Sequence, residues 1–202
     1  VHLSPYGSHL VAQTIATAKV EHFFEPRTNL VANGSMTTAC TTGWQNGGGG
    51  GATLSAASFT PANMNTNGGV HGQGCQMSAG GGTNYLQNTT AFSVAPGHVY
   101  ACRMYVRHSQ TTLASAGNVT VQFVDGSGTA WTDQVTQYYD GAQWLPLASG
   151  ITSSIFQNAD FHAFVVKGRA GAATLTSRVR VTGSDATSPV FVDSVRCWLD
   201  PY

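Results

Sequence analysis

Two arginines and a tyrosine alternate along one short run of the sequence, where Arg103, Tyr105 and Arg107 occupy every second position. In a β-strand this spacing puts all three side chains on one face. Sugars place their apolar faces on aromatic rings and their hydroxyl groups on planar polar side chains such as guanidinium groups. The run therefore predicts a sugar-binding face, although alternate arginines are also typical of a strand face that only meets solvent.

Other aromatic side chains extend this candidate surface. We expect the rings of Trp131, Tyr138 and Tyr139 to point outward from nearby strands or loops, with Trp198 as a further outward ring. This interpretation competes with simple packing, because many of the aromatic residues must fill the core. The predicted ligand-binding residues are Arg103, Tyr105, Arg107, Trp131, Tyr138 and Tyr139.

The sequence offers little that supports catalysis. Glycosidases need two carboxyl groups facing each other across a cleft, but the carboxylates here lie in predicted turns, where Asp is common. The chain has no Gly-x-Ser-x-Gly elbow and no His-Glu-x-x-His motif. Its glycine-rich stretches at 47–51 and 68–74 lack the Gly-Lys-Ser/Thr of a phosphate loop and are predicted to be flexible loops. We predict that the protein is not an enzyme. The turn carboxylates are Asp125, Asp133, Asp140 and Asp160.

Composition argues against two classes of partner. The 202 residues carry nine Lys and Arg against nine Asp and Glu, so no basic excess favours nucleic acid. No run of about 18 apolar residues occurs, so we expect no membrane insertion. Charged residues make up 9% of the chain, compared with about 25% in an average protein. A polar but weakly charged surface suits an extracellular or virion protein, and a GC-rich genome would give a similar composition.

Four cysteines, at 40, 75, 102 and 197, allow three disulfide pairings. Their spacing is not that of a zinc site, and buried free thiols remain an alternative to disulfides. Cys102 and Cys197 each fall on the apolar phase of an alternating run, so we expect both to point into the core. In the last run, this phase also includes Phe191 and Asp193.

The pattern of the chain changes near Pro26. Residues 8–18 fit helical spacing and strand alternation, and we predict a short helix there. From residue 28 onward, short alternating runs are separated by Gly, Asn, Ser and Asp. We therefore predict an all-β chain, a jelly-roll β-sandwich over residues 29–202 preceded by an N-terminal arm or linker over residues 1–28. The predicted strands are 28–32, 52–55, 74–77, 85–94, 99–108, 118–125, 131–139, 143–151, 161–167, 174–182 and 190–199.

Several short motifs occur in the order found in one family of binding modules. Residues 29–36 read Asn-Leu-Val-Ala-Asn-Gly-Ser-Met, and Gly-Trp follows at 43–44. Pro-Gly-His-Val-Tyr at 96–100, Gln-Trp at 143–144 and Val-Phe-Val-Asp-Ser-Val at 190–195 complete the series. Together they resemble the jelly-roll carbohydrate-binding modules of xylanases and cellulases.

This resemblance carries further expectations. It implies that Trp44 and Trp144 pack in the core, and that Cys102 and Cys197 lie on neighbouring strands where a bridge is feasible. No cofactor is required, but the family often holds a structural calcium ion. Asp193 matches one calcium ligand of the family, whereas the opening motif here lacks the Glu that supplies another.

Residues 24–30, Phe-Glu-Pro-Arg-Thr-Asn-Leu, resemble a junction in minor tail proteins of phages that infect actinobacteria. That resemblance implies a host-recognition domain in the virion tail that binds bacterial cell-envelope carbohydrate. Other tail subunits would then be partners, and a homotrimer is one such assembly. Two alternatives stay open: a structural tail domain without a ligand, and a binding module of a secreted glycoside hydrolase.

Overall fold

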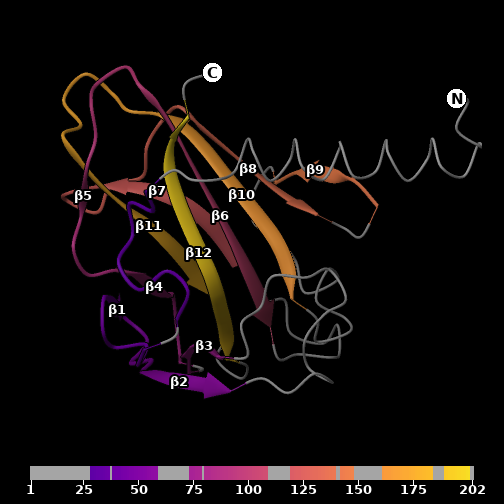
Figure 1. Cartoon of the computed structure of the whole chain (residues 1–202). Coiled ribbons are helices and arrows are strands. Elements are labelled where there is room, and N and C mark those ends of the chain that lie inside the picture. Colours follow the sequence, from indigo (N-terminus) through magenta and orange to yellow (C-terminus); the bar gives the residue numbers. More distant parts are fainter. Residues whose placement is uncertain are drawn as a thin grey trace, which may run out of the picture.

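The computed structural model describes residues 28–36, 38–58, 73–78, 80–108, 119–139, 142–147, 161–183 and 189–200. Within these ranges the regular elements are all β-strands, and they form two antiparallel sheets packed as a sandwich (Figure 1). The fold is an all-β jelly-roll sandwich, as the sequence predicts. The predicted N-terminal helix at 8–18 lies outside the described residues, and the proposed domain boundary at 28–29 stays a prediction.

The smaller sheet has five strands arranged around β11 (Thr176–Gly183). On one side β11 pairs with β4 (Asn84–Asn88) and with the short β5 (Phe92–Ser93), and on the other it pairs with β7 (Val119–Asp125). The outer partner of β4 is β1 (Trp44–Gly48).

The larger sheet has seven strands, with β12 and β6 near its middle. These two long strands pair along most of their length, so they form the centre of the sheet. In spatial order the strands are β2 (Leu54–Ser58), β3 (Gln73–Met77), β12 (Val190–Asp200), β6 (Val99–His108), β10 (His162–Arg169), β8 (Gln134–Tyr139) and β9 (Trp144–Pro146).

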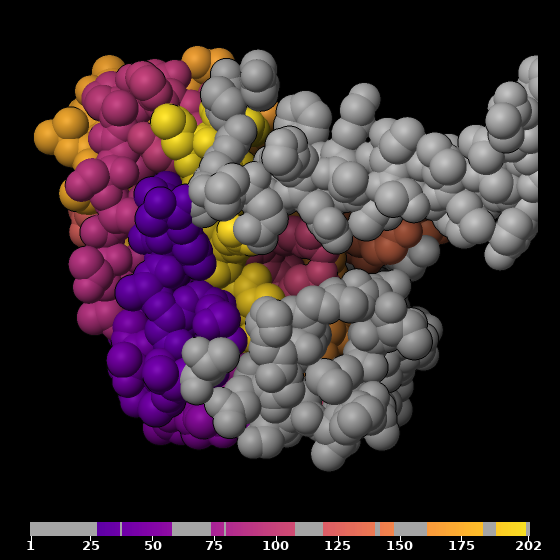
Figure 2. All heavy atoms as spheres, viewed as in Figure 1, coloured from indigo at the N-terminus to yellow at the C-terminus, as the bar shows by residue number. Residues whose placement is uncertain are grey.

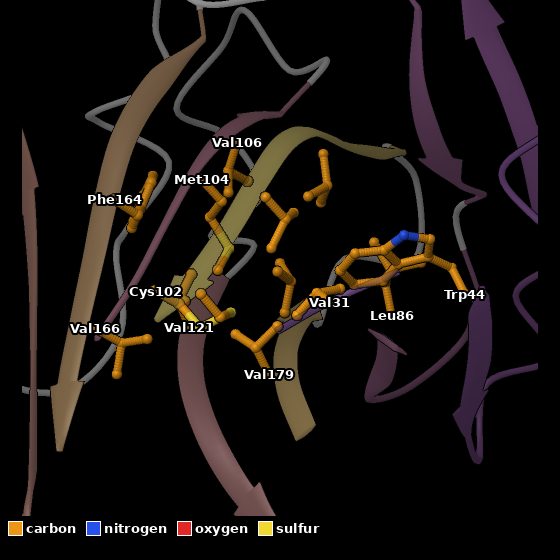
Figure 3. Close-up of a cluster of buried hydrophobic side chains, with 14 of the residues drawn as sticks. Val31, Trp44, Leu86, Cys102, Met104, Val106, Val121, Phe164, Val166 and Val179 are labelled. Atoms are coloured by element: carbon orange, nitrogen blue, oxygen red, sulfur yellow. A yellow bond between two sulfur atoms is a disulfide. The ribbon is translucent and has the colours of Figure 1, made fainter. Parts of the chain in front are cut away.

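The main core fills the space between the two sheets. Met104 and Phe164 of the larger sheet are fully buried and lie opposite Val121 and Val179 of the smaller one (Figure 3). Full burial of each such side chain contributes about 1.5–3 kcal/mol to the free energy of folding, relative to leaving it exposed. Alternation along each strand leaves the other face of each sheet pointing away from this core.

Two disulfides fix the sandwich. Cys102 on β6 lies directly opposite Cys197 on β12, and the two are bonded and buried in the core. The inward direction predicted for both cysteines is therefore confirmed. Cys40 is bonded to Cys75, which ties the segment before β1 to β3.

The strand pattern was predictable in most places, with several local differences. Residues 99–108 match β6 at both ends, but 85–94 divides into β4 and β5. Residues 28–32 form no strand and lie instead beside β12, where the N–H of Leu30 donates to the carbonyl of Cys197. Gly47 and Gly48, expected in a loop, belong to β1.

A β-bulge in β12 reverses the phase of the strand. Its register with β6 shifts between Asp193 and Arg196, and Ser194 has a φ of 54°. The bulge inserts one residue, so Val192 and Cys197 both point into the core although they are five positions apart. Placing Phe191 on the same face as Cys197 was therefore wrong: its ring lies on the outer face of the sheet, beside Arg107.

Candidate functional site

The outer face of the seven-stranded sheet carries Arg103 and Arg107 together with the rings of Tyr105, Tyr139 and Trp144. We call one line of residues across this face the Arg103 row. Arg103 on β6 is directly opposite Arg196 on β12 and Val165 on β10, and Val165 is in turn opposite Gln137 on β8. The row therefore places two guanidinium groups, an apolar side chain and an amide side by side across four strands.

Arg103, Tyr105 and Arg107 do share this face, but they already contact other side chains of the protein. The Arg103 guanidinium lies 5.2 Å from the centre of the Tyr105 ring and donates a hydrogen bond to the Tyr105 hydroxyl. Arg107 lies 5.0 Å from the centre of the Phe191 ring. Tyr105 is only 6% exposed, so the expectation that its ring is open for stacking on a sugar is wrong.

Tyr105 is buried because the outer face has a small apolar cluster of its own. Tyr105 packs in this cluster with Ala57, Phe161 and Ala163, and Tyr139 packs partly against it. Alternation correctly identified the face that Tyr105 occupies, but it gave no information about what packs over that face.

Trp131 and Tyr138 lie on the core side. The Trp131 ring is 6% exposed, stacks on Phe123 at 4.7 Å and meets the edge of Tyr100 at 6.1 Å. Tyr138 packs against the main core, 6.4 Å from the ring of Phe164. The outward directions expected of both residues are wrong. Alternation carried the signal for one of them, because neighbours such as Tyr138 and Tyr139 must face opposite ways in a strand.

Tyr139 and Trp144 form the open aromatic surface of this face. They are directly opposite each other on β8 and β9, with ring centres 5.5 Å apart. Trp144 is 41% exposed, so its expected place in the core is also wrong. Because β9 is the last strand of the sheet, Trp144 has a paired strand on one side only. We call this pair the aromatic platform.

A shallow groove of about 400 Å³ runs over β8 and β10, with Gln137 of the Arg103 row in its lining. Val135, which is 58% exposed, and Val165 give it an apolar floor. Its charged lining residues are Lys167, Arg169 and Asp133. Arg169 is paired with Asp133 at 3.5 Å, and Lys167 with Asp200, outside the groove, at 2.7 Å. Apolar patches beside planar amides and charged groups suit a ligand with apolar faces and many hydroxyl groups.

The opening motif has a structural role. Asn29 donates to the Val195 carbonyl at 2.9 Å and accepts from the Cys197 N–H at 2.9 Å, which holds the segment against the bulge of β12. Figure 2 shows this indigo segment beside the yellow of β12. The Asn33 side chain bonds three carbonyls of the following loop, and its own carbonyl accepts from Trp44 Nε1 at 3.1 Å. Trp44 is buried, as expected.

The residues around Asp193 do not fit the calcium site that the family resemblance implies. Asp193 is fully buried, and its Oδ1 accepts the N–H of Ser194 at 2.5 Å. The opening motif supplies Ser35 and Met36 where the family has a carboxylate. Among the described residues no three acidic, histidine or cysteine side chains come together. A hard cation needs six to eight oxygen ligands, several of them carboxylate oxygens.

The outer face of the five-stranded sheet carries two further arginines, Arg178 and Arg180, both on β11. Arg180 lies 4.0 Å from the centre of the Tyr85 ring and donates to Gln87 at 3.0 Å and to the Gly128 carbonyl at 3.1 Å. Arg178 donates to the carbonyls of Thr89 and Gly126. Burial holds the pKa of Arg180 below its usual range. These guanidinium groups anchor the turn between β7 and β8.

Solved structures with the same fold include a phage protein and carbohydrate-binding modules. The enzymatically active domain of tailspike protein 4 of bacteriophage CBA120 has a TM-score of 0.54 and 14% identity, over 85% of this chain and 21% of that one. A xylan-binding domain of carbohydrate-binding module family 22 has a TM-score of 0.52 and 14% identity, over 88% and 99% of the two chains. The CBM22-1 and GH10 modules of Clostridium thermocellum xylanase 10B, complexed with xylohexaose, have a TM-score of 0.51 and 16% identity, over 87% of this chain and 29% of that one.

Scans against family models and curated proteins find no match. At these identities the likeness shows the fold alone, so the chain has the jelly-roll fold found in carbohydrate-binding modules. Its two disulfides are typical of proteins in oxidising, extracellular surroundings. The described residues include no helix long and apolar enough to cross a bilayer.

Proposed function

We propose that this protein binds carbohydrate on the outer face of its seven-stranded sheet, through the aromatic platform and the adjoining groove. One observation carries the proposal: the exposed Trp144 lies against Tyr139, next to a groove that combines apolar and polar side chains. Rings bind the apolar face of a sugar, while Gln137 and Lys167 offer donors to its hydroxyl groups. The protein acts as a binding module and not as an enzyme.

We further propose that it recognises a bacterial host as part of a phage tail. Three observations support this role: the fold is shared with a phage tailspike domain, residues 24–30 resemble a tail-protein junction, and the disulfides suit an extracellular virion protein. Residues 24–27 of that junction lie outside the described residues. Stacking on one ring contributes about 1 kcal/mol beyond area burial, so each site binds weakly. Many copies on one virion would multiply this modest affinity.

A second candidate role is that of a binding module of a secreted glycoside hydrolase. The observation in its favour is the shared fold with a xylan-binding domain that the chain covers almost completely. The two roles predict different ligands, because a tail protein must bind a bacterial envelope whereas a hydrolase module must bind the polysaccharide that its enzyme degrades.

The test is adsorption of the full chain to bacterial envelope preparations and to an array of purified polysaccharides that includes xylan. Trp144→Ala should weaken binding about fivefold per site, which corresponds to about 1 kcal/mol, with little change in the unfolding midpoint. Leu175→Ala is the matched control, because Leu175 is 66% exposed and lies just before β11 of the other sheet. Adsorption that Trp144→Ala leaves unchanged would reject this face, and no adsorption to any glycan would reject carbohydrate binding.

A further inference from the structure

One line of outward side chains follows β8 from the groove to the aromatic platform. Val135, Gln137 and Tyr139 occupy alternate positions of this strand, and we call them the β8 line. The residues between them point the other way, because the side chains of Gln134 and Thr136 hydrogen-bond to the backbone of β7. Alternation therefore fixes the outward direction of the whole line.

The β8 line is longer than a single sugar. Val135 and Tyr139 are four residues apart, which corresponds to about 14 Å along a strand. Trp144 extends the line at one end, because it lies directly opposite Tyr139 on the edge strand β9 (Figure 1). Asp133, two residues before Val135, extends it at the other end, where it lines the groove. A pyranose ring is similar in size to one aromatic ring, so a ligand that touches both ends has several linked units.

Apolar and hydrogen-bonding side chains lie next to each other along this line. Of the four large apolar side chains that stay exposed among the described residues, Val135 and Trp144 both lie here. Gln137 is exposed between them, and its amide has no hydrogen-bond partner within the described part of the chain. The apolar face of a sugar would cover the valine and the tryptophan, while the amide offers a donor and an acceptor to hydroxyl groups.

The charged side chains along the groove balance one another. Arg169 is paired with Asp133, and both side chains are exposed. Lys167, directly opposite Val135, is paired with Asp200. Exposed ion pairs of this kind contribute little to stability, but they keep donors and acceptors side by side at the surface. An uncharged ligand rich in hydroxyl groups suits this balanced lining better than an ion does.

The geometry of the aromatic platform restricts the shape of the ligand. The ring planes of Tyr139 and Trp144 are inclined to each other by 49°. A flat ligand, such as the surface of a crystalline polysaccharide, cannot lie against both rings at once, whereas a single chain with rotated successive units can follow both. A peptide strand is disfavoured at this edge, because Pro146 in β9 has no N–H for a further ladder.

We propose that the ligand of this face is a single uncharged polysaccharide chain that lies along β8, from Trp144 to Asp133, and is bound by its internal units. Within the described part of the chain both ends of this path are open: β9 is the last strand of the sheet, and the ion pair of Asp133 is exposed. The polymer therefore continues past both ends. This inference rests on the proposed carbohydrate-binding function and narrows its ligand from sugars in general to soluble neutral chains.

The test is the dependence of affinity on the length of the ligand. Isothermal titration calorimetry measures binding of the full chain to size-fractionated hydrolysates of xylan, dextran and bacterial envelope polysaccharide, from the disaccharide to the octasaccharide. We expect affinity for the recognised polymer to rise about tenfold from disaccharide to hexasaccharide and then level off, because added units gain contacts only until the line is covered. Raising the salt concentration should change the affinity less than about twofold. Reduction of the terminal sugar should leave hexasaccharide binding unchanged.

Variants locate the path of the chain. Val135→Ser should lower hexasaccharide affinity about threefold through lost apolar contact, but should leave the disaccharide unaffected, because a disaccharide on the platform does not reach this position. Gln137→Ala should lower hexasaccharide affinity about fivefold, as expected for one lost hydrogen bond. The matched controls are Leu175→Ser and Gln122→Ala, which make similar changes at exposed or partly exposed positions near or on the other sheet and should leave binding unchanged.

Several outcomes would overturn this inference. They are equal affinity for the disaccharide and the hexasaccharide, loss of binding when the terminal sugar is reduced, and adsorption to an insoluble polymer whose soluble fragments do not bind. An equal effect of Val135→Ser and Leu175→Ser on the hexasaccharide would also contradict the proposed path. Each result leaves the proposed function standing if envelope adsorption still depends on Trp144. Absence of binding to every glycan would instead contradict the proposed function itself.

Discussion

The Arg103 guanidinium lies 5.2 Å from the centre of the Tyr105 ring and donates a hydrogen bond to its hydroxyl, two positions along the same strand. The ring is 6% exposed and packs with Ala57, Phe161 and Ala163. Tyr105 is therefore part of a second apolar cluster on the outer face of the seven-stranded sheet, and its ring and hydroxyl hold the neighbouring Arg103 in place.

Tyr105→Ala should destabilise the protein by about 3 kcal/mol, because it removes a buried ring and leaves a cavity. Tyr105→Phe keeps the ring, loses one hydrogen bond and should cost about 1 kcal/mol. Urea denaturation followed by tryptophan fluorescence measures both. A Tyr105→Ala variant as stable as the parent would show that the cluster does not contribute to stability.

The sequence was informative about which residues form strands and less so about which way side chains face. Alternation predicted β6 at both ends, because no irregularity interrupts that strand. In β12 the same reasoning failed at the bulge, since one extra residue reverses the direction of all that follow. A bulge at Ser194, where φ is 54°, has no reliable signal in a single sequence, because a positive φ is uncommon for Ser and no glycine marks the position.

Only part of the candidate site was predictable, again because side-chain direction depends on tertiary structure. The outer face was found from Arg103 and Arg107, whose charge and spacing mark them as outward residues. The predicted locations of the two tryptophans were the wrong way round. Trp131, expected on the surface, fills the end of the core, and Trp144, expected in the core, is exposed at the sheet edge. Tryptophan suits both places, and only the tertiary pairing of β8 with β9 decides between them.

Gly34 lies where the opening segment meets the bulge, and its replacement should be costly. A Cβ at this position would overlap the Val195 carbonyl oxygen and lie 2.5 Å from Nδ2 of Asn29. Because backbone cannot move aside easily, we expect Gly34→Ala to cost about 3 kcal/mol. Gly49→Ala is the control, since nothing lies within 4 Å of a Cβ there. Thermal unfolding of both variants would test this, and equal melting temperatures would contradict the close approach.

The two disulfides should differ in their contributions. Cys102–Cys197 closes a loop of 95 residues and Cys40–Cys75 one of 35. In the chain-entropy model these loops are worth about 4.7 and about 3.8 kcal/mol, so the longer one contributes about 1 kcal/mol more. Guanidinium denaturation of the two double Cys→Ala variants measures the difference. A larger loss from the shorter loop would show that native packing outweighs chain entropy here.

The turn after β7 should make part of the stability sensitive to acid. Asp125 Oδ1 accepts hydrogen bonds from the Ser127 hydroxyl at 2.6 Å and from the N–H groups of Ser127 and Thr129 at 2.9 Å. These bonds, the Ser127 hydroxyl foremost, hold the pKa of Asp125 below its ordinary value of 3.8. The folded state therefore binds a proton less readily than the unfolded state, and the ionised carboxylate favours folding.

This contribution is complete above the unfolded pKa of 3.8 and is lost as the pH falls through the lower folded value. Asp125→Asn keeps an oxygen acceptor but removes the charge, so it should unfold at lower temperature than the parent near neutral pH. The gap in melting temperature should narrow as the pH is lowered past 3.8, because the parent then loses the same charge. Asp133→Asn, which removes an exposed carboxylate paired with Arg169, is the control. A gap that stays constant across the acid range would show that the charge of Asp125 does not stabilise the turn.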